Sequence, residues 1–308
     1  MASDDEESAY EKTIKDPTPM DPEKAAVRLK EVKRLFDQEG MVFWLGSGTC
    51  LGAIRENRFI PWDDEMDTAS VVGMHGLTED AVYQMAQVFT NHGFLARVRP
   101  NRRWISCALV KDGLRTDWTV HRLINGRATE FPGVDLPVYT FEHLKEIEFI
   151  GESFRVPNPP EDYLQAKYGP EWRTPKGPGF EADVIANIRD GSALTGLAKV
   201  RRLLISWITP WRMGTIRVFD RDGQPVPGAE VRVAGLGTSL TNAKGYARIY
   251  VHDTTYFAVS VSFGEHKEVL YEEVLEPGQS YVYRPGPVVT KEEHYKMGVR
   301  AMALTRDQ

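Results

Sequence analysis

The hydrophobic pattern changes near residue 214, and this change constrains the fold more than any other feature of the chain. Before it, the helix-period segments 21–40 and 78–92, which Asp21 and Thr78 can cap, alternate with short apolar runs. Three of these runs, 94–98, 104–110 and 114–120, are predicted strands, and the pattern is typical of an α+β domain. After the change, short segments with strand periodicity are divided by Asp-Gly, Lys-Gly and Pro-Gly turns, which predicts a small β-sandwich. The 308 residues also exceed what one core usually organises. We therefore predict two folded domains.

The predicted boundaries follow the changes in composition along the chain. The connector between the domains is basic and carries tryptophans, so it would either lie on an anionic membrane or pack the two domains together. We favour packing, because Pro210 limits the helix to a few turns. The predicted parts are a disordered acidic tail (1–20), the α+β domain (21–195), the amphipathic connector (196–213), the β-sandwich (214–286) and a C-terminal tail (287–308).

Composition and charge exclude several classes of protein. The net charge of −6 argues against nucleic acid as a partner, because nucleic-acid-binding domains are usually basic. Two cysteines, Cys50 and Cys107, do not make a disulfide framework, so we expect buried thiols. The acidic N-terminus lacks the apolar core of a secretory signal, and no apolar run approaches the ~20 residues of a membrane span. These features predict a cytoplasmic protein, with peripheral contact at the inner face of the membrane as its only membrane association.

A glycine-containing segment marks the first half of the candidate site. An apolar run ends at Leu45 and continues into Gly46, Ser47, Gly48 and Thr49. Glycines let a backbone approach a ligand closely, while hydroxyls and loop amides can hold phosphate oxygens. A Gly-Ser-Gly loop by itself is a turn far more often than a phosphate site.

A cluster of carboxylates forms the second half of the candidate site. In a strand, alternate residues share a face, so Asp63, Glu65 and Asp67 would lie together, with Asp64 and Met66 on the other side. Neighbouring carboxylates repel each other, and a hard cation such as Mg²⁺ or Mn²⁺ would offset that repulsion. The residues alone leave two alternatives equally open, a metal–phosphate site and a solvated acidic loop.

Two blocks of sequence resemble the LicD family, which includes the fukutin-related proteins. The first is GTCLGAIRENRFIPWDDEMD (48–67), and the second is VPNPPEDYLQAKYGPEWRTP (156–175). The resemblance extends over about residues 25–180 and implies a nucleotidyltransferase fold, a mixed sheet with flanking helices. Glu65 departs from the family pattern, which usually has Asp there, and its longer side chain would shift a bound metal.

The resemblance implies a phosphotransferase of the cell envelope, acting in lipopolysaccharide or teichoic acid synthesis. Family members move a phosphorylated alcohol, such as phosphocholine or a polyol phosphate, from a CDP-linked donor to a glycan hydroxyl. By this resemblance Glu65 and Asp67 would bind a divalent metal, Mg²⁺ or Mn²⁺, with a third carboxylate on a neighbouring strand. Asp117 is our choice, against the alternative of a surface or salt-bridged aspartate. Asp63 would bind a second metal or act as general base.

Four further residues are candidates for binding the substrate. Arg55 would pair with phosphate or with the acidic cluster. The aromatic side chains of Tyr163, Tyr168 and Trp172 would form a cage around a donor head group such as choline, or simply pack the domain.

The segments 214–233 and 241–251 resemble the carboxypeptidase regulatory-like domain, a transthyretin-like β-sandwich, and the resemblance covers roughly residues 214–285. The resemblance leaves three roles open for it: binding a glycan, binding a protein, or supporting the first domain. Two alternatives to the leading function also remain. One is transfer of another nucleotidyl or sugar-phosphate group on the same fold, and the other is a degenerate domain that binds a glycan without catalysis.

Overall fold

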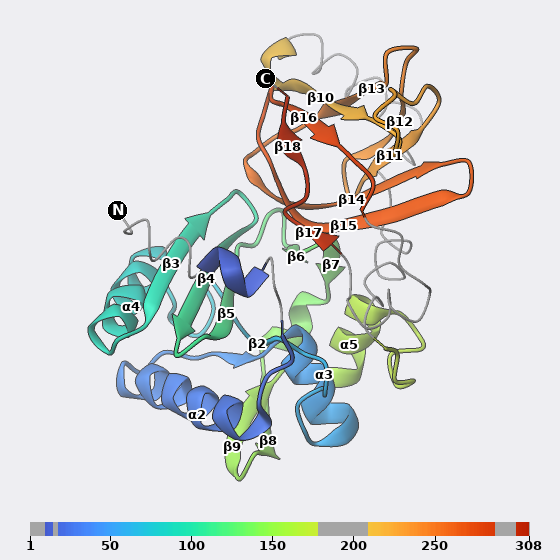
Figure 1. The fold of residues 1–308 in the computed structure, drawn as a ribbon. Helices are drawn as coiled ribbons and strands as arrows, with labels where there is room; N and C mark the ends of the chain where they lie inside the picture. The colour runs from blue at the N-terminus through green and yellow to red at the C-terminus, as the bar shows by residue number, and fades with distance from the viewer. Residues whose placement is uncertain (1–9, 15–17, 178–208, 287–299, 308) are drawn as a thin grey trace. The chain divides into compact units, whose positions relative to one another are not determined.

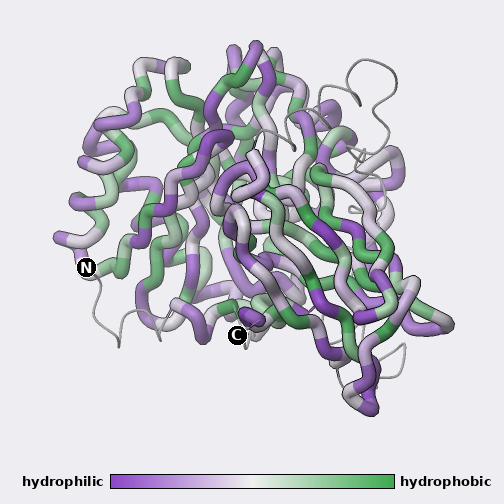
Figure 2. Tube along the Cα trace, turned by 90° about the horizontal axis from the view of Figure 1, so that it is seen from above, coloured by the Kyte–Doolittle hydropathy of each residue, from purple (hydrophilic) through white to green (hydrophobic). Residues whose placement is uncertain are grey.

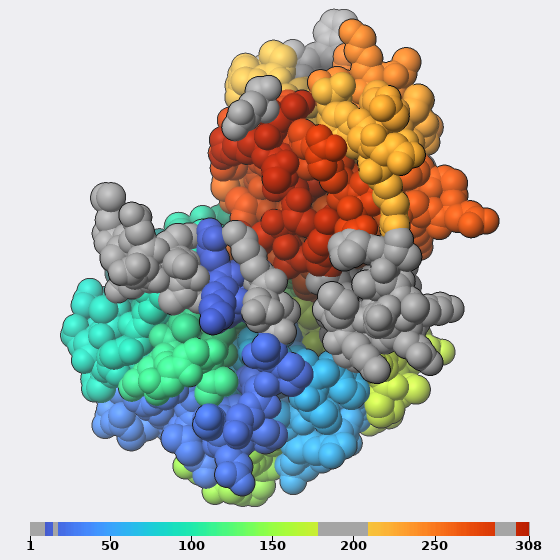
Figure 3. Space-filling view, viewed as in Figure 1, coloured from blue at the N-terminus to red at the C-terminus, as the bar shows by residue number. Residues whose placement is uncertain are grey.

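The computed structural model describes residues 10–14, 18–177, 209–286 and 300–307. Its contacts separate into two units: residues 1–130 with 134–175, and residues 131–133 with 176–308. Unit 1 is a mixed α+β structure, and the described part of unit 2 consists of two sheets and a short 3₁₀ turn (Figure 1). Figure 3 shows the atoms of unit 1 in blue to yellow-green and most of unit 2 in gold to red. The predicted fold class is thus confirmed.

A five-stranded mixed sheet organises unit 1. β2 and β5 pair in parallel at its centre, and the other neighbours pair antiparallel. In spatial order the strands are β1 (Trp44–Leu45), β2 (Glu65–Val71), β5 (Leu114–His121), β4 (Trp104–Lys111) and β3 (Leu95–Pro100).

The two predicted long helices form where their capping residues indicate. α2 (Pro22–Gln38) begins after Asp21, whose carboxylate accepts hydrogen bonds from the amides of the first turn. α4 (Glu79–Asn91) begins after Thr78, which caps it in the same way. α2 packs on β5, and α4 packs on β3.

A cluster of aromatic rings holds α2 onto the sheet. Phe36 of α2 is fully buried and contacts the rings of Phe43, Phe89 and Trp118 at centroid distances of 4.6, 5.2 and 4.9 Å. The indole nitrogen of Trp118 donates a hydrogen bond to Ser70 Oγ, so this polar group is not left unsatisfied in the core.

The helix α3 (Ser47–Glu56) of unit 1 was not predicted. The segment that we expected to be a glycine loop is the start of this helix. Gly48 and Gly52 disfavour a helix on propensity alone, by about 1 kcal/mol each relative to alanine. Packing against β2 and α5 outweighs that preference here.

The rest of unit 1 consists of two hairpins and a helix that closes over α3. α5 contacts α3 and β7, and this packing brings residues from distant parts of the sequence to the start of α3. The elements are β6 (Ala128–Glu130), β7 (Val134–Leu136), the 3₁₀ turn η1 (Val138–Phe141), β8 (Lys145–Phe149), β9 (Glu152–Val156) and α5 (Pro160–Tyr168).

Unit 2 has two sheets, as its alternating sequence predicted. After the 3₁₀ turn η3 (Pro210–Arg212), the first sheet has the order β13 (Tyr246–Tyr250), β10 (Met213–Val218), β16 (Ser280–Tyr283) and β18 (Thr305–Arg306). The second has the order β12 (Gly237–Leu240), β11 (Glu230–Val233), β14 (Thr255–Phe263), β15 (His266–Leu275) and β17 (Arg300–Ala301).

Burial in unit 2 follows the two-residue period of its strands. In β10, Gly214, Ile216 and Val218 are buried while the residues between them are partly exposed. Ile216 and Val218 share a core with Val231 and Val259 of the second sheet. The same alternation of hydrophobic and hydrophilic residues is visible along the strands in Figure 2. The resemblance to the carboxypeptidase regulatory-like domain is compatible with these sheets and stays a prediction.

The two predicted tails are partly ordered. In the N-terminal tail, residues 10–14 are helical, and Tyr10 and Ile14 are buried, so the prediction of disorder is wrong for this stretch. In the C-terminal tail, β17 and β18 each join one of the sheets. The buried carboxylate of Glu273 accepts hydrogen bonds from the amides between those two strands. Most of the predicted connector, residues 196–208, lies outside the described residues.

Within the described residues, no helix is long and apolar enough to cross a membrane.

Phe36→Ala should lower the free energy of unfolding by about 3–5 kcal/mol, because it leaves a cavity between three aromatic rings. Val27 lies on the same helix and is 67% exposed, so Val27→Ala should change the stability by less than about 0.5 kcal/mol. Urea denaturation followed by near-ultraviolet circular dichroism measures both variants. Equal losses would contradict the assigned core.

Candidate active site

The parallel register of β2 and β5 places Asp67 opposite Asp117 and Glu65 opposite Arg115. Side chains at paired positions of neighbouring strands point to the same face of a sheet. Asp117, chosen from the sequence as the carboxylate on a neighbouring strand, therefore lies beside Asp67. The segments that bring them together are 50 residues apart in the chain.

The position of Asp67 disfavours its ionised form. Burial raises the pKa of Asp67 to about 7, and the nearby carboxylates of Asp117 and Glu130 act in the same direction, while Lys167 and the Gly48 amide oppose it. A carboxylate in this position can hold a proton near neutral pH. A cation beside it would favour the ionised form.

The residues at the start of α3 hold Asp67 in place. The Gly48 amide donates to Asp67 Oδ2 at 2.9 Å, and the Gly46 amide donates to the Asp67 carbonyl oxygen at 3.0 Å. Thr49 Oγ1 accepts from the Asp67 amide at 2.8 Å, and the Ser47 amide donates to Tyr163 Oη at 2.8 Å. We expected these amides to hold phosphate oxygens. In the structure those of Gly46, Ser47 and Gly48 donate to protein atoms, and only the Gly48 amide orients a carboxylate, that of Asp67.

Two glycines let the segment between α3 and β2 lie directly on the backbone of α3. A Cβ at Gly48 would fall 2.7 Å from Asp63 Oδ2, and a Cβ at Gly52 would fall 2.5 Å from the Arg58 carbonyl oxygen. Asp63 is thus beside the first turn of α3. Ser47 adopts a φ of 31°, in the left-handed region that is costly for a residue with a side chain.

Arg115 is a charged residue of the site that the sequence analysis did not single out. Its guanidinium is buried, contacts the Glu65 carboxylate, and lies 3.8 Å from Asp64 Oδ2 and 3.9 Å from Asp117 Oδ1. Asp64 was expected on the opposite face together with Met66. It turns toward Arg115 instead, because residues 63 and 64 precede β2 and do not follow the alternation of the strand.

The carboxylates fit a metal ion only in part. In the described part of the chain, no group of three or more His, Cys, Asp and Glu side chains is arranged to hold a metal. The predicted set of Glu65, Asp67 and Asp117 is therefore not assembled, and Glu65 is engaged by Arg115. Asp67 and Asp117 remain a pair of hard oxygen donors, and Asp117 Oδ1 is buried without a hydrogen-bond partner. That pair fits a divalent cation whose other ligands come from substrate and water.

A second charged pair lies behind the start of α3 and was also missed. Glu130 and Lys167 are both buried, and Lys167 Nζ lies 2.6 Å from Glu130 Oε1. Ser47 Oγ and Tyr163 Oη also donate hydrogen bonds to the Glu130 carboxylate. Burial alone would raise the pKa of Glu130, but Lys167, His121 and the hydrogen bonds hold it below its ordinary value. The available signal was the four-residue spacing of Tyr163 and Lys167, which puts both on one face of α5.

The predicted substrate residues are not gathered into one cage. Tyr163 and Trp172 are 1% and 6% exposed and belong to the core, as the packing alternative predicted. The side chain of Tyr168 is partly exposed. Burial, and then the negative charge of Asp67 and other nearby groups, raises the pKa of its hydroxyl, which indicates that Tyr168 lies near the carboxylates. Arg55 Nη2 lies 2.8 Å from Glu56 Oε1, so it pairs with its neighbour and not with the acidic cluster.

Both cysteines are buried, as predicted, and burial raises the pKa of each thiol, which keeps them uncharged.

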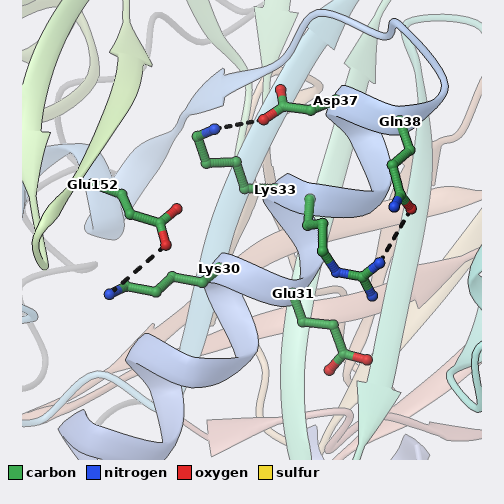
Figure 4. Close-up of a pocket in the computed structure, with 7 residues that line it drawn as sticks. Lys30, Glu31, Lys33, Asp37, Gln38 and Glu152 are labelled. Atoms are coloured by element: carbon green, nitrogen blue, oxygen red, sulfur yellow. Dashed lines mark hydrogen bonds and ion pairs between the residues drawn. The ribbon is translucent and has the colours of Figure 1, made fainter.

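A separate hollow lies on the outer side of α2 and contains none of the predicted site residues (Figure 4). Its charges pair with each other, as in Lys33 with Asp37 and Lys30 with Glu152. It therefore offers no argument for a competing active site.

Lys167→Met should destabilise the protein by about 3–5 kcal/mol, because it leaves Glu130 buried without its counter-charge. The double variant Glu130→Gln/Lys167→Met removes both charges and should recover part of that loss. Urea denaturation of the single and double variants measures the coupling. Strictly additive losses would contradict a coupled buried pair.

Comparison with known proteins identifies the domain that carries the site. An uncharacterised protein of Rickettsia typhi is 30% identical over 79 residues, which are 26% of this chain and 24% of that protein. The chain thus matches about a quarter of the length of this relative. Residues 40–159 match the family described as LicD/FKTN/FKRP, nucleotidyltransferase domain. This range includes α3, β2 and β5, and with them Asp63, Asp67 and Asp117. Through this range, the chain is similar to the LicD/FKTN/FKRP family over 120 of its 308 residues.

Proposed function

We propose that this chain is a metal-dependent transferase that moves a phosphorylated alcohol from a CDP-linked donor to a hydroxyl of a glycan acceptor. The similarity of residues 40–159 to the LicD/FKTN/FKRP family supports a transferase. The proposal goes further and names phosphocholine or a polyol phosphate as the group transferred, with CMP as the product that leaves. The observation that carries it is the pairing of Asp67 with Asp117 next to the start of α3.

Asp67 and Asp117 are the residues that would hold the metal, Mg²⁺ or Mn²⁺. When bound, a divalent cation supplies charge neutralisation for the donor diphosphate and for the leaving group. Three hydrogen bonds fix the backbone and carboxylate of Asp67 before any ligand arrives. A carboxylate fixed in this way loses little conformational entropy when it binds, which favours both affinity and precise placement.

Asp63 is the proposed general base. It lies against Gly48, whose amide also orients the carboxylate of Asp67, so it is close to the metal-binding pair. In this role its carboxylate accepts the proton of the acceptor hydroxyl while the oxygen attacks phosphorus. Tyr168, the partly exposed aromatic near these carboxylates, is our candidate for contact with the donor.

A glycan-binding domain without catalysis is the second candidate. Arg115 favours it, because a fixed guanidinium already balances part of the negative charge of Glu65, Asp64 and Asp117. The two candidates differ in their response to metal. A transferase needs a divalent cation for nucleotide binding or turnover, whereas a degenerate domain does not.

Asp67→Asn should abolish transfer and remove the stabilisation by CDP-linked donors with Mg²⁺ or Mn²⁺, because it removes charge from the proposed metal site. A ligand that binds only the native state adds about 2.7 kcal/mol of stability at a concentration of one hundred times Kd, and so raises the melting temperature. A thermal-shift screen of CDP-choline and CDP-ribitol, with and without metal, makes the measurement. Asp80→Asn, an exposed aspartate on α4, is the matched control and should behave as the wild type. Turnover retained in Asp67→Asn would refute the metal assignment.

Glu65→Gln should affect metal binding much less than Asp67→Asn, because Glu65 is bound by Arg115. It should instead reduce stability, by about 3–5 kcal/mol, since a buried guanidinium loses its partner. Calorimetric titration of Mn²⁺ gives the affinity of each variant, and urea denaturation gives the stability. A larger loss of Mn²⁺ affinity in Glu65→Gln than in Asp67→Asn would show that Glu65 is a ligand after all.

A further inference from the structure

The outward face of the first sheet of unit 2 carries three arginines around two aromatic rings. The register pairs Arg217 of β10 with Tyr246 of β13, so both side chains project from the same face. Arg248 stands two residues beyond Tyr246 on β13, and Phe219 stands two residues beyond Arg217, so both point the same way. Arg284 reaches this face from the end of β16. We call these five residues the arginine face.

Cation–π contacts hold two of the guanidinium groups against the same aromatic ring. Cζ of Arg217 lies 4.6 Å from the centroid of the Phe219 ring and 4.9 Å from that of Tyr246. Cζ of Arg284 lies 4.6 Å from the same Phe219 ring. Two like charges are thus fixed next to one ring, and their planar groups are pre-oriented. An anion that contacts both would relieve their repulsion.

No carboxylate neutralises this face. Among the described residues, none of Arg217, Arg248 and Arg284 forms an ion pair. The nearest acid along β10 is Asp220, and its carboxylate accepts hydrogen bonds from the backbone of its own turn, at Asp222 and Gln224. Arg217 Nε donates a hydrogen bond to the Lys244 carbonyl oxygen at 3.4 Å, and the remaining guanidinium hydrogens of the arginine face are available to a ligand.

Some other arginines of unit 2 are treated differently. Arg300 pairs with Glu268 at 2.9 Å, and Arg306 pairs with Glu276. Among the described residues, Arg212 and Arg221 share the absence of such partners, and the arginine face differs from them in gathering its cations around two aromatic rings. The absence of such partners is notable in a chain whose net charge is −6, because the surrounding charge would favour acidic partners for exposed arginines.

We propose that the arginine face binds the phosphate groups of a phosphorylated glycan. Guanidinium groups match phosphate oxygens in a two-point geometry, and three of them along neighbouring strands suit a repeating anionic chain. A membrane surface fits less well, because the exposed large apolar side chains of unit 2, Trp211 and Leu240, are not part of this face. The choice of a glycan rests on the proposed function, whose acceptor is a glycan.

The test measures binding of full-length protein to a phosphorylated mannan and to the same mannan after phosphatase treatment. The wild type should bind the phosphorylated polymer and not the dephosphorylated one. Arg217→Gln/Arg284→Gln should weaken binding at least tenfold. The matched control, Arg232→Gln/Lys267→Gln, removes two charges from the second sheet and should stay within twofold of the wild type, with both melting temperatures unchanged.

Three results would overturn the proposal: no binding of the phosphorylated mannan by the wild type, equal weakening in both double variants, or binding only to vesicles that contain anionic lipid. The stabilisation by CDP-linked donors with metal is measured on the same proteins and should be unaffected by Arg217→Gln/Arg284→Gln. Mannan binding without any response to CDP-linked donors would refute the proposed transferase activity and leave the arginine face standing.

Discussion

The parallel pairing of β2 with β5 is the interaction on which the candidate site depends. Its register sets Asp67 beside Asp117 and Glu65 beside Arg115. The same two strands thus bring two carboxylates together and place a guanidinium group next to them. A shift by one residue would exchange these side chains with the apolar ones that face the core. The pairing also lies between α2 on one side and α3 at the end of the site, so the same core that stabilises unit 1 fixes the geometry of its charges.

Periodicity and capping residues were sufficient to predict most regular elements. α2 and α4 formed at their predicted caps, Asp21 and Thr78, and the three strands from β3 to β5 formed close to their predicted positions. These features are local, because helix period, strand period and caps all act within a few residues. Where tertiary contacts decide, as in α3 and in the strands of the C-terminal tail, the local pattern pointed elsewhere.

The carboxylates on β2 and β5 could be named from the sequence, but the charged residues around them could not. Asp67 follows from the family pattern and from strand periodicity, and Asp117 from the expectation of a third carboxylate on a neighbouring strand. Arg115, Glu130 and Lys167 could not be named, because their meaning arises only when distant segments meet. Arg115 also changes the interpretation of Glu65. The longer carboxylate reaches a guanidinium across the sheet, so this departure from the family pattern has a partner that a sequence motif does not reveal.

The glycines of α3 have a consequence for how the site is built. A helix of ten residues with two glycines is weak by itself, because short helices are marginal and each glycine weakens them further. Its order comes from Asp67, which accepts from its first turn, and from the close fit of Asp63 against Gly48 and of Arg58 and Ile60 against Gly52. Helix and carboxylates therefore form as one cooperative unit. Whatever loosens the segment between α3 and β2 also melts the start of the helix, so damage to this site would be all-or-none and not graded.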